Sequence, residues 1–271
     1  MLNFLVDPLN NLDVYNKLKT DIEKKNSPMA TYGIIDESIG HILYALREHT
    51  KRQILLVTYN EVRSRKIYED IRNLGNNNVF LLPKRELVFY EVDAFSYEST
   101  NERLGIVSRL VKGEDLLLVT SIEAIFHKLM SRDVLKSYSH ELRLGEEINL
   151  DDLIKLLTDG GYERVNMVEG IGQFSLRGGI MDFFPPYSGN PIRIELFDEE
   201  IDSIRTFDIT NQRSIEVLDY TFIFPVKETL ILDEYRENII DNLNKDLIKS
   251  LSKSKISVIE KENLESKFNK Y

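Results

Sequence analysis

The stretch GIIDESIG, which begins at Gly33, is the part of the sequence closest to a phosphate-binding loop. Such loops follow the pattern GxxxxGK and then Ser or Thr, in which backbone N–H groups surround the phosphates and the lysine contacts the outer ones. Here Ile39 stands at the lysine position and Gly40 at the hydroxyl position. Asp36 and Glu37 would also add negative charge where phosphate should lie. These residues predict a degenerate loop that binds no nucleotide.

Other residue combinations that could carry chemistry are weak. Glycines cluster at 170–172 and 178–179, but neither stretch links a strand to a helix in a βαβ unit. The chain has no cysteine, and its four histidines lack the spacing of metal ligands. The acidic run 198–202 is typical of a solvated turn, and no serine or threonine has the context of a catalytic nucleophile. We therefore expect no catalytic residue, no metal and no cofactor in this chain.

A charged sheet face is the most informative feature. Apolar and polar residues alternate in two stretches, as in strands with one buried and one solvent-facing side. Counted by twos, Arg177 faces outward with Phe183, and Arg193 and Glu195 face outward on the next strand. The expected inner side consists of Phe174, Leu176, Ile180, Ile192, Ile194 and Leu196. Arginine beside exposed aromatic residues is typical of a protein-binding hot spot, and an ordinary solvated sheet face is the alternative.

The first half of the chain contains the elements of a parallel α/β sheet. Helical periodicity alternates with short apolar runs, and strands separated by helices imply right-handed crossovers. The expected helices cover 9–25, 39–48, 61–74, 101–112 and 121–130, and the expected strands cover 31–35, 53–58, 79–82 and 116–120.

A different pattern begins after about Ser137. A capped helix at 149–158 is followed by expected strands at 173–180, 192–197 and 201–207. Their strict alternation favours an antiparallel sheet, and hence an α+β module. After Pro225 the sequence becomes polar and helical, and we expect its lysine- and serine-rich end to be a cut through a longer protein.

Composition limits the classes of protein that the chain can belong to. Its 271 residues are 42% hydrophobic and 30% charged, which fits one large or two smaller globular domains. The net charge of −10 argues against a surface that binds nucleic acid throughout. The absence of cysteine suits a reducing compartment, and no apolar run is long enough for a membrane span. We expect a cytoplasmic protein without membrane contact.

Three blocks of sequence resemble a known family. They are GYERV at 161–165, GQFSLRGGIMDFFP at 172–185 and PIRIELFDEEIDSIRTFD at 191–208, followed by QRS at 212–214. Upstream, LP at 82–83, NERL at 101–104 and VTSIEA at 119–124 also fit. Together they are similar to the amino-terminal region of bacterial transcription-repair coupling factors (Mfd), which is itself similar to the excision-repair protein UvrB. The resemblance covers roughly residues 10–230.

The resemblance implies a fold and a function. It implies a UvrB-like, helicase-like α/β domain with helices on both faces of its parallel sheet, beginning with residues 1–136. An inserted UvrA-binding α+β domain with an antiparallel sheet would follow at 137–220, and a return to the α/β domain at 221–271. In the family the ATP- and Mg-dependent motor and the RNA-polymerase-binding domain lie downstream. The resemblance thus implies a non-catalytic, monomeric module that recruits UvrA to stalled RNA polymerase, with polymerase and DNA contacted only by regions absent here.

The resemblance also implies binding residues. Arg164, Arg177, Arg193 and Glu195 match positions of the family that contact UvrA. UvrB usually carries a further arginine where this chain has Ser175. The alternation described above selects Arg177, Arg193 and Glu195 independently, with Phe183 as an apolar neighbour.

Two alternatives stay open at this point. One is a UvrB-like ATPase and DNA-damage clamp, although UvrB has an intact phosphate loop and a long aromatic hairpin. The stretch 86–100 is too short for that hairpin. The other is a packing domain whose arginine face is covered within a longer protein.

Overall fold

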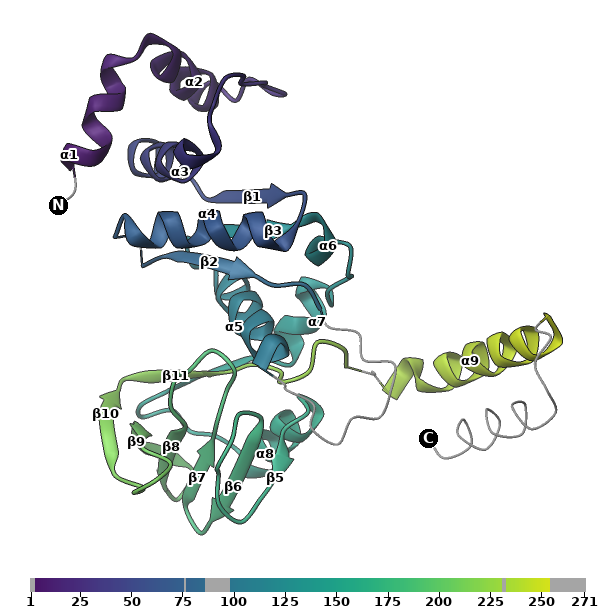
Figure 1. Ribbon diagram of the computed structural model, residues 1–271. Helices are drawn as coiled ribbons and strands as arrows, with labels where there is room; N and C mark the ends of the chain where they lie inside the picture. Colours follow the sequence, from purple (N-terminus) through teal and green to yellow (C-terminus); the bar gives the residue numbers. More distant parts are fainter. Residues whose placement is uncertain (1–2, 76, 86–97, 231–232, 254–271) are drawn as a thin grey trace. The chain divides into compact units, whose positions relative to one another are not determined.

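The computed structural model describes residues 3–75, 77–85, 98–230 and 233–253 (Figure 1). The predicted tail end and most of the stretch 86–100 lie outside the described residues. The chain divides into two compact units, Met1–Glu228 and Thr229–Tyr271. The second unit contains helix α9 (Asp233–Lys253), which agrees with the polar helical pattern after Pro225. No helix in the described part of the chain combines the length and the apolarity needed to cross a membrane.

The first unit begins with an α/β module built on a parallel sheet of order β1-β3-β2. Both neighbours of β3 run parallel to it, as predicted from the alternation of helices and strands. Its elements in chain order are α1 (Asn3–Val6), a 3-10 turn (Asp7–Asn11), α2 (Asp13–Glu23), α3 (Asp36–Thr50), β1 (Ile54–Thr58), α4 (Glu61–Asn73), β2 (Val79–Leu82), α5 (Glu98–Lys112), β3 (Leu117–Ser121), α6 (Ile122–Ile125) and α7 (Arg132–Ser137).

Helices cover both faces of this sheet (Figure 1). On one face Ile67 and Ile71 of α4 pack with Leu117 of β3. On the other face Ile106 of α5 packs with Leu118. Because successive residues of a strand point to opposite sides, the continuous apolar run of β3 supplies both layers. The predicted α/β fold is confirmed.

Two local predictions in this module are wrong. The stretch 31–35 forms no strand, because Gly33 has a left-handed backbone (φ 79°) and α3 begins at Asp36. The helix predicted at 121–130 is only the four-residue α6, although Ser121 caps it as predicted by accepting a hydrogen bond from the backbone N–H of Ala124.

The second module of this unit is built on a six-stranded sheet of order β10-β9-β8-β7-β6-β5. Strands β6 to β10 are antiparallel in sequence, as predicted, and β5 pairs parallel to β6 at one edge. A smaller sheet joins β4 to β11. The elements are β4 (His140–Arg143), α8 (Leu150–Asp159), β5 (Glu163–Arg164), β6 (Gln173–Arg177), β7 (Ile180–Phe183), β8 (Ile192–Phe197), β9 (Glu200–Phe207), β10 (Ser214–Leu218) and β11 (Tyr220–Ile223).

Helix α8 closes the core on one side of this sheet only. Its N-cap is Asn149, whose side chain accepts hydrogen bonds from two backbone N–H groups of the first turn. Leu153 and Leu157 of α8 pack with Phe174, Met181 and other buried residues of the strands. The opposite side of the central strands carries mainly charged and polar side chains.

Helix α5 joins the two modules. Gly105 lies where a Cβ atom would come within 3.1 Å of the Pro186 carbonyl oxygen, so the helix approaches the second module's backbone closely. Arg103, almost fully buried, donates from Nε to Glu228 at 2.5 Å. Lys112 places its Nζ 3.8 Å from the centroid of the Tyr187 ring, and burial lowers the pKa of Lys112.

Candidate protein-binding face

The turn between β6 and β7 decides which side chains reach the surface. The stretch predicted as one strand at 173–180 is a hairpin whose two-residue turn, Gly178-Gly179, pairs Arg177 with Ile180. Paired residues lie on the same side of a sheet, so counting by twos across the turn gives the wrong side for β7. Ile180 therefore lies on the side of Arg177.

Phe183 is consequently a core residue and not a surface anchor. It pairs with Phe174, and its side chain is completely buried against the aromatic ring of Tyr162. The prediction that Phe183 faces outward beside Arg177 is wrong, because the hairpin turn shifts its alternation by one residue relative to Arg177.

The outer side of the sheet consists of two cross-strand rows. The strand register places Arg177, Ile180, Glu195 and Ser203 in one row, and Ser175, Asp182, Arg193 and Arg205 in the next. We call these eight residues the outer face. Three of the predicted residues, Arg177 on β6 and Arg193 and Glu195 on β8, thus lie on one side of the sheet, as the alternation predicted. The two strands are not neighbours, because β7 pairs with both of them.

Asp182 lies at the centre of the outer face. Its Oδ1 accepts a hydrogen bond from Arg193 Nε at 2.7 Å, and its Oδ2 accepts one from Arg193 Nη2 at 2.9 Å. Arg177 Nη2 donates to the same Oδ2 at 2.9 Å. The side chain of Asp182 is 1% exposed, whereas those of Arg193 and Arg177 are 16% and 51% exposed. The carboxylate is therefore buried beneath two guanidinium groups.

Arg193 is mainly held within the molecule. Besides Asp182 it donates to Gln212 Oε1 at 2.9 Å, and its guanidinium carbon lies 4.4 Å from the centroid of the buried Phe207 ring. The hydrogen bond to Asp182 raises the pKa of Arg193. The planar guanidinium group of arginine suits both interactions, because it can bond a carboxylate at two nitrogens and stack on an aromatic ring. Arg193 thus stabilises the sheet, and Arg177 is the arginine with an open side.

Glu195 is also held by its neighbours. Ser203 Oγ donates to Glu195 Oε2 at 3.1 Å, and Arg205 forms an ion pair with Oε1. About a third of the Glu195 side chain is exposed. Its carboxylate is fixed in direction and still reachable from solvent.

Arg164 lies at the edge of the sheet, on the short strand β5. The register with β6 places it beside Phe174, on the opposite side from Arg177. Both arginines nevertheless line one shallow hollow at this edge, together with Val165, Asn166 and Leu176. The edge thus brings Arg164 to the border of the outer face, as predicted, but not onto it.

The predicted degenerate loop does not have the architecture of a phosphate loop. Gly33 lies just before α3 and does not follow directly on a strand. Ile39 is part of α3, and its side chain packs against the hydrophobic cluster that includes Ile67 and Ile71 of α4. A Cβ atom on Gly40 would lie 3.1 Å from Asp70 Cβ, so the glycine permits α3 and α4 to pack closely. Asp36 pairs with Arg63 at 2.7 Å. These residues serve helix packing, and nucleotide binding itself stays untested.

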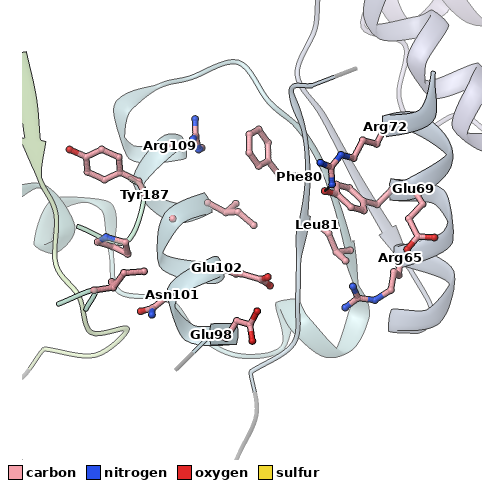
Figure 2. A pocket seen from close by; sticks show the side chains of 15 residues that line it. Arg65, Glu69, Arg72, Phe80, Leu81, Glu98, Asn101, Glu102, Arg109 and Tyr187 are labelled. Carbon is pink, nitrogen blue, oxygen red and sulfur yellow. Dashed lines mark hydrogen bonds between the residues drawn. The ribbon is translucent and has the colours of Figure 1, made fainter. Parts of the chain in front are cut away.

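A separate cleft of about 900 Å³ lies along the open edge of β2 (Figure 2). Figure 2 shows two walls, with Arg65, Glu69 and Arg72 on α4 and Glu98, Asn101, Glu102 and Arg109 on α5. Arg109 is already paired with Glu114 at 2.9 Å. The mixed charges favour neither an anion nor a cation. Among the described residues there is also no group of three side chains that could hold a metal.

Sequence reasoning missed Asp182 and Arg205. Asp182 stands between Met181 and Phe183, which are both completely buried, so the alternation could have placed it on the outer side once the turn was known. Arg205 has the same signal, since it stands between Ile204 and Thr206, which are both buried. The register with β8 places it beside Arg193. Both residues lie within the blocks that carry the family resemblance.

Comparison with known proteins agrees with this architecture. The family model described as the UvrB interaction domain matches residues 141–228. The transcription-repair-coupling factor of Bacillus subtilis (strain 168) is 41% identical over 191 residues, which is 70% of this chain and 16% of that protein. That of Staphylococcus epidermidis (strain RP62A) is 35% identical over 209 residues, covering 77% and 17%. That of Staphylococcus aureus (strain bovine RF122) is 34% identical over 186 residues, covering 68% and 16%.

The six-stranded sheet and its outer face therefore lie within the stretch that matches the UvrB interaction domain. The chain is related to the transcription-repair-coupling factors, and the predicted resemblance to their amino-terminal region is confirmed. The chain spans about a sixth of the length of the curated relatives that it matches.

Proposed function

We propose that the chain recruits the nucleotide excision repair protein UvrA through the outer face. The observation that carries the proposal is Arg177, a half-exposed arginine anchored at one nitrogen to the buried Asp182. Arg164 at the sheet edge and Glu195 on the same side as Arg177 complete the set that the family resemblance selects. Arginine beside a hollow is typical of a hot spot in a protein interface.

Arg193 has a different role in this proposal from the one that the sequence suggested. Its side chain is mostly buried and bonded to Asp182 and Gln212, so it supports the surface from below. The partner would contact Arg177 and Arg164 directly, with Glu195 fixing the orientation. Phe183 has no part in the interface.

The chain itself would be a non-catalytic recruitment module in transcription-coupled repair. The full-length relatives' ATP and Mg chemistry, and their contacts with RNA polymerase and DNA, would belong to regions outside this chain. The proposal includes a monomeric, cytoplasmic module. It is supported by the UvrB interaction domain and by the relationship to transcription-repair-coupling factors.

Titration of the chain with purified UvrA tests the proposal. Losing one partner of a charged interface pair costs ~2–5 kcal/mol, and ~1.4 kcal/mol corresponds to a tenfold change in affinity. Arg177→Ala should therefore weaken UvrA binding roughly thirtyfold, and Arg177→Glu should abolish it. Arg132→Ala is the matched control, because Arg132 lies exposed on α7 and its loss changes the net charge equally.

Two results would contradict the proposal. If both Arg177 variants bind UvrA as the unchanged chain does, the outer face is an ordinary solvated sheet. If the thermal midpoint falls together with the affinity, Arg177 is structural. The alternative of a UvrB-like ATPase receives less support, since Ile39 packs in a helix core and Asp36 is paired with Arg63. Calorimetric titration with ATP and Mg²⁺ distinguishes the two, because the ATPase alternative requires measurable binding.

A further inference from the structure

We propose that Asp182 is a positioning residue whose buried carboxylate orients Arg177 toward the partner protein. The inference rests on the proposed binding of UvrA. Asp182 itself would not touch the partner, because only 1% of its side chain is exposed.

The bonds around the carboxylate give it a fixed direction. Arg193 binds both oxygens from the neighbouring strand β8, so the carboxylate cannot rotate without breaking a bidentate pair. Arg177 then attaches to Oδ2 from the other neighbour, β6. Arg193 thus fixes the orientation of the Asp182 carboxylate, and the carboxylate in turn restricts the side chain of Arg177.

Only one end of Arg177 is held in this way. Among the hydrogen bonds of the described residues, its guanidinium group uses Nη2 alone, and about half of its side chain is exposed. A guanidinium group carries five N–H donors, so donors remain for a carboxylate of the partner. The bond to Asp182 therefore restricts the side chain without occupying its binding edge.

Restriction before binding should increase affinity. A free arginine has many rotamers, and an interface that immobilises it loses that freedom on association. If Asp182 has already restricted Arg177, the loss is smaller. The carboxylate also compensates the repulsion between the guanidinium groups of Arg177 and Arg193, which share one oxygen. Removing its charge should thus weaken binding about three- to tenfold although Arg177 is still present.

Asp182→Asn is the decisive variant, because it keeps the shape and removes the charge. We expect a three- to tenfold loss of UvrA affinity in the otherwise unchanged chain and less than a twofold loss in a chain that already carries Arg177→Ala. A merely structural role would lower affinity equally in both backgrounds, and that result would overturn the proposal. Asp202→Asn, an exposed position on β9, is the control of equal charge change and should have no effect.

A second variant separates a loss of affinity from a loss of stability. If Asp182→Asn lowers the thermal midpoint, Asp182→Asn combined with Arg193→Gln removes both charges of the buried pair, so that no charge is left unpaired. This double variant should fold and should show the same loss of affinity. Unchanged affinity in the folded double variant would contradict the positioning role.

Nitrogen-15 NMR of the Arg177 Nε–H group gives a readout that does not depend on UvrA. Slow guanidinium rotation in the unchanged chain and fast rotation in Asp182→Asn are expected, and equal rotation in both would refute the inference. If the unchanged chain does not bind UvrA, the proposed function fails, whereas the NMR comparison still decides whether Asp182 positions Arg177.

Discussion

Replacing Arg193 by alanine should destabilise the protein, although the residue lies on the outer side of a sheet. The change removes both hydrogen bonds to Asp182, the bond to Gln212 and the contact with the Phe207 ring. Among the side-chain hydrogen bonds of the described residues, Asp182 would then keep only the bond from Arg177. Its carboxylate, which is 1% exposed, cannot recover the lost bonds from water without opening the sheet face.

The size of the effect follows from burial. Removing one partner of a buried ion pair costs about 3–5 kcal/mol, because the other charge is left without compensation. Arg177 compensates part of that charge, so we expect about 3 kcal/mol for Arg193→Ala. In a domain of this size, 1 kcal/mol lowers the melting temperature by about 2–4 °C, which gives a shift of about 6–12 °C. Arg177→Ala removes a half-exposed pair and should cost below about 1 kcal/mol.

Thermal and urea unfolding of both variants measure this difference. Arg213→Ala is the control, because Arg213 is exposed beside the C-terminal end of β9 and its loss changes the net charge by the same amount as the loss of Arg193. A midpoint for Arg193→Ala that lies within about 1 °C of the control would refute the buried-pair argument. It would mean that water or Arg177 compensates the Asp182 carboxylate once Arg193 is gone.

Four further changes test the sheet, its β6–β7 turn and Tyr187. Ser175→Ala should leave the melting temperature unchanged or raise it in thermal unfolding, because the buried Ser175 hydroxyl has no hydrogen-bond partner among the described residues. Gly179→Ala should cost about 1–3 kcal/mol in urea unfolding, since its Cβ would lie 2.9 Å from a backbone oxygen, whereas Gly178→Asn should be tolerated in open space at φ 61°. Burial raises the pKa of Tyr187 to about 12, so its contribution to stability is complete below pH about 10 and is lost as pH rises through 12. Tyr187→Phe should therefore lose less stability than the unchanged chain between pH about 10 and 12 in urea titrations.

Much of the fold could be predicted because the relevant signals are local. The apolar runs of β1, β2 and β3 and the strict alternation of β8 lie within single strands, and the structure has all four where the sequence placed them. The N-caps Ser121 and Asn149 were equally local, because one side chain bonds the helix that directly follows. Periodicity and capping need no knowledge of distant residues.

The remaining elements depend on partners that a local pattern does not reveal. Strand β4 exists because it pairs with β11, which lies about 80 residues further along the chain. The stretch 31–35 has strand-forming residues, but the left-handed backbone at Gly33 interrupts it, and no strand in the described part of the chain pairs with it. Strand formation requires a partner, so propensity alone predicted one strand too many there and overlooked β4.

The candidate site depended on a single turn. The residues Arg177, Arg193 and Glu195 came from alternation within strands, and the structure places all three on the outer face. Phe183 came from counting through the turn, and there the prediction failed. Asp182 was overlooked for the same reason, since it occupies the outward position that the miscounting assigned to its neighbours.

That turn couples stability to recognition. Gly178-Gly179 is short enough to pair Arg177 with Ile180, and this pairing buries Phe183 while placing Asp182 beneath the two arginines. One additional residue in the turn would shift the register and exchange the two sides of β7. A buried aromatic ring would then face solvent, and the carboxylate would point into an apolar core without its arginines. The register that builds the core is therefore the same register that exposes Arg177, so the proposed binding geometry requires the folded hairpin.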